Sequence, residues 1–311
     1  MRVLVTGGAG FLGAAAVRAL LARGNRVIAF DSQPEALARL GQNPHLVAFP
    51  GDITDMANIA HAVLLHKPDV VLHCAAIVGV VSSVGSPLNV VRVNVEGSLN
   101  VFEAMRLAGV RRCIHVSSEE TYGPFQSDRI DEEHPQRPAM PYGICKLAVE
   151  HLGRTYRDLH GLDVVNLRTS WVYGPGLPRN RIPRNLVDAA LAGQPLHLPD
   201  GADFAIDHTY VDDAVSAVLA AMDRDKLPHD AYNVASGTAT TVGEIAAIVR
   251  ELVPGADVSA GPGPLRFSEH LPVVRKGALD VSRAAADLGW RPRFDMRAGL
   301  AAYIGARRAS H

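Results

Sequence analysis

A tyrosine and a lysine lie four residues apart in the stretch YGICK, residues 142–146. Residues at this spacing share one face of a helix, so the Tyr142 phenol and the Lys146 ammonium can point at one site. A free phenol has a pKa of about 10, and a nearby ammonium lowers that pKa by stabilising the phenolate. The pair therefore predicts a base for an alcohol. Lysine, with a compact charge and three donors, can also reach a ribose hydroxyl of a cofactor.

Two serines and two glutamates follow an apolar run at residues 111–117, in the stretch HVSSEETYG. Parallel sheets bind their ligands at the carboxyl ends of strands, where we expect Ser117 and Ser118 to lie. A serine hydroxyl at this place can hydrogen-bond the reacting alcohol. Glu119 and Glu120 allow two interpretations: a second proton-transfer group, or a pair of loop carboxylates that face water.

A glycine-rich turn, TGGAGFLG at residues 6–13, precedes the first predicted helix. Gly7 (or Gly8), Gly10 and Gly13 let the backbone turn tightly and approach a pyrophosphate at the start of a helix. Asp31 lies eighteen residues past Gly13, where a carboxylate accepts hydrogen bonds from the adenosine ribose. A 2′-phosphate is disfavoured there, so the predicted cofactor is NAD rather than NADP.

Another aspartate, Asp52 in GDITD, ends the third predicted strand. Its carboxylate could meet the adenine amine of the dinucleotide. The alternative is that Asp52 only caps the next helix.

These residues require a scaffold that brings strand ends together, and the apolar pattern predicts one. Strand-like runs alternate with helix-like segments such as residues 14–24, an arrangement typical of a parallel sheet covered on both faces. Right-handed crossovers then give a doubly wound (Rossmann) α/β fold. The predicted strands are residues 2–6, 26–30, 45–49, 69–75, 111–117 and 162–168.

Beyond about residue 170, proline and glycine become frequent and the segments shorten. We therefore expect a dinucleotide-binding domain over residues 1–168 and a smaller α/β substrate-binding domain over residues 169–206 and 236–311. Residues 207–222 resemble a strand end followed by an amphipathic helix, so residues 207–235 are expected to return to the first domain.

Composition excludes several partners. The net charge is -1 and no basic stripe is present, so neither nucleic acid nor an anionic membrane surface is expected. Three widely spaced cysteines, Cys74, Cys113 and Cys145, predict free thiols in a reducing compartment, and no metal site is predicted. The chain opens on a short strand, and no apolar segment reaches the roughly 18 residues of a membrane span. We expect a cytoplasmic protein.

Taken in order, these motifs resemble the extended short-chain dehydrogenases/reductases of the NAD-dependent epimerase/dehydratase group. The resemblance covers nearly the whole chain and rests on TGGAGFLG, GDITD, HCAA, VNVEGSLNVFEA, SSEETYG, YGICK, LRTSWVYGPG, YVDDAV and DLGWRP. It implies that Tyr142 is the acid/base, that Lys146 holds the nicotinamide ribose, that Ser118 positions the reacting oxygen and that Asn94 supports the proton relay. The cofactor-binding residues that it implies are Gly7, Gly10, Phe11, Leu12, Gly13, Asp31, Ser32, Asp52, Ile53, Ala75 and Ala76, together with Asn94, Tyr142 and Lys146.

The chain departs from the family pattern where a sugar nucleotide would bind. Trp171 replaces an asparagine that is common before VYGP, and Ile206 replaces an arginine that typically meets the diphosphate. Arg179, Arg181 and Arg275 are candidates to bind an anion instead, and the alternative is that they lie in solvated loops. With Ser118, Glu119, Glu120 and Trp171 they form the predicted substrate residues.

The resemblance implies hydride transfer at a secondary alcohol of a sugar-type substrate, in a nucleotide-sugar epimerase. Three alternatives stay open: a dehydrogenase of a free sugar or sugar acid, a dehydratase or decarboxylase that uses Glu120, and a non-catalytic NAD-binding regulator. Relatives commonly dimerise through a four-helix bundle, so a homodimer through helices at about 87–108 and 142–160 is expected by analogy.

Overall fold

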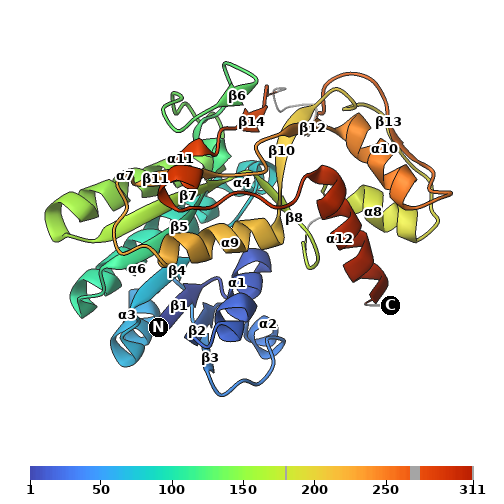
Figure 1. Cartoon of the computed structure of the whole chain (residues 1–311). Coiled ribbons are helices and arrows are strands. Elements are labelled where there is room, and N and C mark those ends of the chain that lie inside the picture. The colour runs from blue at the N-terminus through green and yellow to red at the C-terminus, as the bar shows by residue number, and fades with distance from the viewer. Residues whose placement is uncertain (179–180, 267–273, 310–311) are drawn as a thin grey trace.

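A computed structural model describes residues 1–178, 181–266 and 274–309. Its centre is a seven-stranded sheet in the order β11-β7-β5-β4-β1-β2-β3, and every neighbouring pair is parallel (Figure 1). The doubly wound sheet predicted from the sequence is therefore confirmed. The strands are β1 (Arg2–Thr6), β2 (Arg26–Asp31), β3 (Leu46–Pro50), β4 (Val70–His73), β5 (Arg112–Ser118), β7 (Asp163–Thr169) and β11 (Ala231–Val234).

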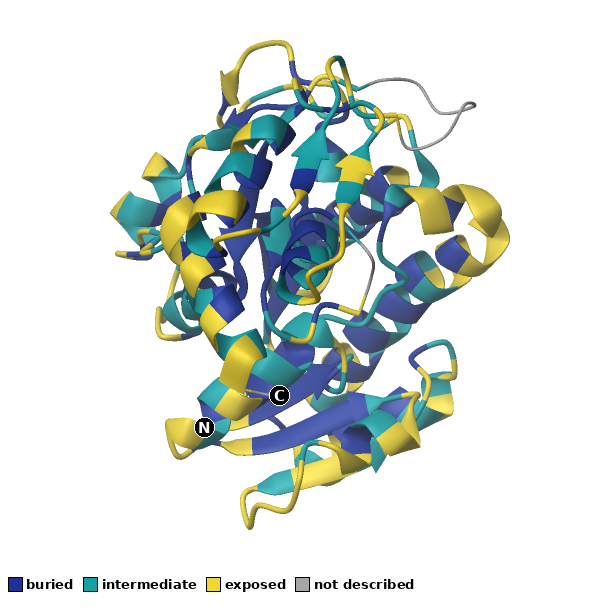
Figure 2. Ribbon diagram, turned by 90° about the vertical axis from the view of Figure 1, so that its right-hand side faces the viewer, coloured by how far each residue is buried: buried dark blue, intermediate teal, exposed yellow. Residues whose placement is uncertain are grey.

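Two layers of helices bury the two faces of this sheet. In β1, Val3 and Val5 pack on one face and Leu4 on the other, because successive side chains of a strand point to opposite sides. Helices α1 (Phe11–Ala22) and α9 (Val211–Met222) cover the first face. Helices α3 (Met56–His66), α6 (Gly97–Ala108) and α7 (Pro141–His160) cover the second. The strands are accordingly buried between exposed helix surfaces (Figure 2), except for the edge strand β3, which contains no buried residue.

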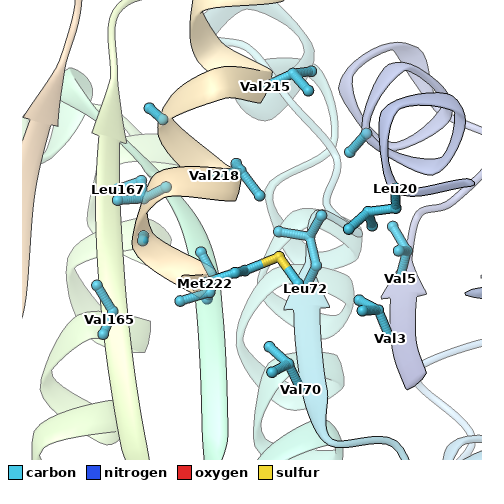
Figure 3. Packing of buried hydrophobic residues seen from close by; sticks show 14 of the residues in the cluster. Val3, Val5, Leu20, Val70, Leu72, Val165, Leu167, Val215, Val218 and Met222 are labelled. Carbon is cyan, nitrogen blue, oxygen red and sulfur yellow. The ribbon is translucent and has the colours of Figure 1, made fainter. Parts of the chain in front are cut away.

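Helix α9 shows how such a face is filled. Val218 and Met222 project from it toward the sheet and meet side chains of β4 and β7, among them Leu72 and Val165 (Figure 3). Each of these side chains is at most 5% exposed, and burying one such side chain contributes about 1.5–3 kcal/mol. None of the helices in the described ranges is long and apolar enough to cross a membrane.

Short elements connect the strands near the site. They are α2 (Pro34–Ala38), α4 (Val80–Gly85), α5 (Pro87–Val91), the π-turn η1 (Arg92–Glu96) and the 3₁₀-turn η2 (Glu119–Thr121). Helix α3 begins at an N-cap, Asp55, whose carboxylate accepts from the Ala57 N–H at 2.8 Å.

A second, smaller assembly packs beside the first (Figure 1). Its three-stranded sheet contains β8 (Trp171–Tyr173), β10 (Ala205–Tyr210) and β12 (Ala239–Thr241). Helices α8 (Arg184–Leu191), α10 (Val242–Leu252) and α12 (Met296–Ala309) share its apolar core. The remaining elements are the pairs β9 (Leu196–Leu198) with β13 (Val258–Ala260) and β6 (Arg129–Ile130) with β14 (Ala278–Leu279), and helix α11 (Ser282–Asp287).

The chain crosses between the two assemblies more than once. Strand β10 belongs to the smaller sheet, yet α9 follows it at once and packs on the large sheet, and β11 then pairs with β7. Residues 205–234 thus start in one assembly and end in the other. The two assemblies are joined by continuous secondary structure, which fixes the position of one against the other.

A buried ion pair ties α7 to the strands beneath it. Arg168 on β7 donates to both carboxylate oxygens of Glu150 on α7, at 3.1 and 2.7 Å, and Ser117 on β5 donates to the same carboxylate at 2.6 Å. Arg168 and Glu150 are at most 2% exposed. A bidentate, fully hydrogen-bonded pair fixes geometry as well as charge. The helix that carries Tyr142 and Lys146 is thereby held against the strand that carries Ser118.

The first turn of α7 also approaches the loop after β5 very closely. A Cβ on Gly143 would collide with the backbone carbonyl oxygen of Glu120. Only glycine lets the helix lie this near to η2. This contact places the residue before it, Tyr142, beside the end of β5.

Gly143→Ala should therefore push α7 away from η2. We expect a loss of about 1–3 kcal/mol in the free energy of unfolding, typical of overpacking, measured by chemical denaturation. The control is Gly305→Ala, at a position in α12 where a Cβ meets nothing within 4 Å. That variant should be stabilised by about 0.5–1 kcal/mol. Equal effects in the two variants would contradict the close approach.

Candidate active site

A cavity of about 680 Å³ opens at the carboxyl ends of the central strands. This size falls within the range of small-molecule sites. Predicted residues from both halves of the site line it: Gly7, Gly10, Phe11, Leu12, Gly13, Asp31, Ser32, Asp52, Ile53, Ala75, Ala76, Ser118, Glu119, Glu120, Tyr142, Lys146, Trp171 and Arg181. The fold thus brings most of the predicted residues to one place.

The glycine-rich turn forms one end of the cavity. Gly7 has a φ of +65°, and a Cβ on Gly13 would collide with the Gly7 carbonyl oxygen. The turn is therefore too compact for side chains, and α1 begins directly after it with Gly10 as its N-cap. Free N–H groups at this helix start suit a pyrophosphate.

Asp31 stands at the end of β2 beside this turn. Its carboxylate accepts hydrogen bonds from the Ala9 N–H and the Gln33 N–H, both at 3.0 Å. These bonds fix the carboxylate in a half-buried position where a ribose diol can donate to it. The chemistry of this end therefore fits NAD, whose ribose carries no 2′-phosphate.

Asp52 and Asn94 take different positions from each other. Asp52 is exposed at the cavity edge and accepts from the Thr54 N–H at 2.8 Å. Asn94 is 2% exposed and is not among the cavity-lining residues. Its amide instead pairs with both backbone groups of Ile77, at 2.7 and 2.9 Å. Asn94 therefore holds the loop after β4, which itself lines the cavity, and its predicted cofactor contact stays a prediction.

Ser118, Tyr142 and Lys146 also line this cavity. The Tyr142 and Lys146 residues are 6% and 4% exposed. Burial lowers the pKa of Lys146 to about 8, so the amine still carries its charge at neutral pH. Lys146 Nζ donates to the Val116 carbonyl oxygen at 2.7 Å. The arrangement can hold a phenol, a hydroxyl and a cation around one alcohol.

Glu119 and Glu120 do not lie in a water-facing loop. Lys276, from the C-terminal part of the chain, reaches them with Nζ at 2.5 Å from Glu119 and 3.1 Å from Glu120. The Lys276 and Glu119 side chains are 4% and 1% exposed. Burial, and then the charge of Glu120, raises the pKa of Glu119 to about 8. Lys276 was not among the residues predicted from the sequence, and the scarcity of lysine in the chain is the one sequence signal that points to it.

The smaller assembly contributes Trp171 and Arg181 to the cavity. The Arg181 guanidinium lies 4.7 Å from the centroid of the Trp171 ring, in a cation–π contact. Burial lowers the pKa of Arg181, while the charges of Tyr142, Glu120 and Glu119 oppose that shift. Arg181 is therefore near the reacting end, where its donors can meet an anionic group. Ile206 is 1% exposed in the core around β10.

Two arginine predictions have other outcomes. Arg275 does not line the cavity: its exposed side chain pairs with Asp128 at 2.5 Å, where the segments that lead into the paired strands β14 and β6 meet. That prediction is corrected here. Arg179 lies outside the described residues.

Family comparison agrees with this geometry. Residues 3–235 match the model of the NAD dependent epimerase/dehydratase family. The chain belongs to this family. The prediction that the cofactor is NAD is thereby confirmed. The members of this family are NAD-dependent enzymes.

Individual family members are similar over nearly their full length. A UDP-glucose 4-epimerase from Mycolicibacterium smegmatis is 34% identical over 97% of this chain and 96% of its own. A dTDP-glucose 4,6-dehydratase from Xanthomonas campestris pv. campestris is 31% identical over 96% of this chain and 90% of its own. The structure of Thermotoga maritima UDP-glucose 4-epimerase with UDP-glucose has a TM-score of 0.90 at 29% identity, covering 100% of this chain and 99% of that one.

Proposed function

We propose that this protein is a nucleotide-sugar epimerase that inverts a secondary alcohol through transient oxidation. The observation that carries the proposal is the meeting of Ser118, Tyr142 and Lys146 in the cavity that Asp31 and the glycine-rich turn also line. The similarity to UDP-glucose 4-epimerases over nearly the whole chain supports it.

The reaction requires a proton acceptor and a group that positions the alcohol of the substrate. We assign the acceptor to the Tyr142 oxygen, which takes the proton of the sugar hydroxyl while Ser118 holds that hydroxyl by a hydrogen bond. The glycine-rich turn and Asp31 would hold NAD, which would accept the hydride from the sugar carbon and later return it. Lys146 stabilises the phenolate and holds the cofactor ribose. Tyr142 then returns the proton to the oxygen of the inverted alcohol.

The substrate's anionic part is assigned to Arg181. Its guanidinium stacks on Trp171 and lies near Tyr142, so it can donate to a phosphate or carboxylate close to the sugar. This role would offset the missing arginine at Ile206. A dehydrogenase of a free sugar acid would use the same contact and differs only in releasing reduced cofactor.

A second candidate function is dehydration of a nucleotide sugar. The specific observation is the cluster of Glu119, Glu120 and Lys276 beside Ser118. When two carboxylates share a buried site with one ammonium, one of the carboxyl groups is favoured to stay protonated. Elimination of water from the sugar would need such a proton donor. The 31% identity to a dTDP-glucose 4,6-dehydratase is compatible with it.

We further propose a cytoplasmic homodimer. The free thiols of the three cysteines support a reducing compartment. Large apolar side chains are exposed on neighbouring helices α4, α5 and α7, where a second copy could cover them. They are Val81, Val84, Leu88, Val91 and Ile144, at 54%, 45%, 86%, 48% and 50% exposure.

Tyr142→Phe should lower kcat about 10²–10⁴-fold, the usual contribution of a general acid/base, with NAD affinity retained. The assay supplies UDP-glucose and related sugar nucleotides, identifies the product sugar by chromatography and follows NADH by absorbance. We expect an epimer and no net NADH. Arg181→Gln should raise KM with little change in kcat. Stoichiometric NADH would instead identify a dehydrogenase, and full turnover by Tyr142→Phe would refute the assigned base.

Glu120→Gln separates epimerisation from dehydration. An epimerase should keep kcat within about threefold, because its proton transfer goes through Tyr142 alone. In a dehydratase, this substitution should lower kcat by about 10²-fold or more, and no dehydrated sugar should accumulate. The matched control is Glu133→Gln, whose side chain is 77% exposed and pairs with Arg283. Loss of epimer formation in Glu120→Gln, with the control active, would decide against simple epimerisation.

Leu88→Glu should disrupt the proposed dimer, because it places a charge at the most exposed residue of the proposed apolar interface. Light scattering on the wild type should give twice the 33.2 kDa of one chain, and the variant should give one chain. Val47→Glu, on the edge strand β3 and far from α7, is the control. A monomeric wild type would rule the dimer out.

A further inference from the structure

Two buried histidines lie directly beneath Lys146. His115 on β5 and His73 on the adjacent strand β4 are 0% and 1% exposed. Their rings stack with centroids 5.6 Å apart and an interplanar angle of 29°. His115 Nε2 is 3.4 Å from Lys146 Nζ. Neither histidine has a role in the function proposed above.

The hydrogen bonds around His115 determine which ring nitrogen carries the proton. Asn166 Nδ2 donates to the Asp230 carbonyl oxygen at 3.0 Å, so the other amide atom, Oδ1, faces His115. His115 Nδ1 lies 2.8 Å from this oxygen and must be the donor. In the neutral ring, Nε2 then presents a lone pair toward Lys146.

The second ring is fixed in the same way. Ser98 Oγ donates to the Asn94 carbonyl oxygen, so it must accept from His73 Nε2 at 2.8 Å. His73 Nδ1 accepts from Thr6 Oγ1 at 2.6 Å. Each ring therefore has one donor and one acceptor bond in its neutral form. Burial, followed by the Lys146 charge, lowers the pKa of His115 to about 3.

An ammonium has three N–H donors, and two of them have protein acceptors here. One points to the Val116 carbonyl oxygen at 2.7 Å and one to His115 Nε2 at 3.4 Å. The second distance is long but within reach of a hydrogen bond that tightens when ligand binds. The third donor is left for the cavity that Lys146 lines.

We propose that His115 is a positioning residue for Lys146: its neutral imidazole accepts one N–H of the ammonium and thereby directs another into the cofactor cavity, beside Tyr142. The inference rests on the proposed role of Lys146 in stabilising the Tyr142 phenolate. It adds a residue on β5 that acts only through Lys146.

Other ionisable groups around the pair do not replace this contact. Glu150 is engaged by Arg168, and burial raises the pKa of Cys74 to about 12 and raises that of Cys145, so both thiols stay neutral. Among the described hydrogen bonds, only Val116 and His115 accept from Lys146. The charged or titratable neighbours of Lys146 and Tyr142 are His73, Cys74, His115, Cys145, Glu150 and Arg181.

Two substitutions at His115 separate positioning from packing. His115→Gln can place a carbonyl oxygen near the Nε2 position and keep an acceptor for Lys146. His115→Asn keeps a polar group near Asn166 but is too short to reach the ammonium. His115→Asn leaves a cavity one methylene larger than His115→Gln does, so the two variants must be compared by a readout that lost packing alone does not move.

The readout is the pKa of Tyr142, measured from phenolate absorbance as the difference between each protein and its Tyr142→Phe counterpart. We expect His115→Asn to raise this pKa by about 1 unit, because the less ordered ammonium stabilises the phenolate less. His115→Gln should stay near the wild-type value, and NAD should bind more weakly to the Asn variant alone. An equal pKa in all three proteins would overturn the proposal.

This titration needs no substrate, so it stands apart from the epimerase assay. Failure to turn over any sugar nucleotide would leave the His115 result valid, and an unchanged pKa would leave the epimerase proposal intact. Should either variant fail to fold, ¹⁵N spectra of histidine-labelled wild type give a second test. His115 should remain the neutral Nδ1–H tautomer from pH 5 to pH 8; an imidazolium there would overturn the proposal.

Discussion

The buried charge of Lys146 is the constraint on which the site depends. An ammonium that is 4% exposed loses most of its hydration, and burial lowers its pKa to about 8. The fold compensates with acceptors fixed to the sheet, the Val116 carbonyl and the His115 ring. A cation held this way has a defined direction as well as a charge. That direction is what gives the Tyr142 phenol its proposed chemistry.

The Lys146 ammonium can act on the Tyr142 phenol only if helix α7 is fixed in one position relative to the sheet. The ion pair between Arg168 and Glu150 anchors the helix from β7, and the Ser117 hydroxyl extends the link to β5. The missing Cβ at Gly143 lets the first helical turn touch the loop after β5. Local packing and a buried polar network therefore serve the same end, which is the placement of the helix rather than stability alone.

The opposite wall of the cavity is built from parts distant in sequence. Trp171 and Arg181 come from the smaller assembly, and Glu119 and Glu120 are held from behind by Lys276, in the segment before β14. The Lys276 ammonium pairs with both Glu119 and Glu120 and so offsets the repulsion between these two carboxylates.

The sequence by itself determined the local features: the strand pattern, the glycine-rich turn with Asp31, and the Tyr142–Lys146 pair one helical turn apart. These follow from periodicity and short spacing, which the backbone converts directly into geometry. Only the tertiary structure decided that Lys276 meets Glu119 across 157 residues of chain, that Asn166 orients His115, and that Arg275 faces away from the cavity. Such contacts depend on how distant segments pack, and the order of residues along one strand or helix contains no record of that packing.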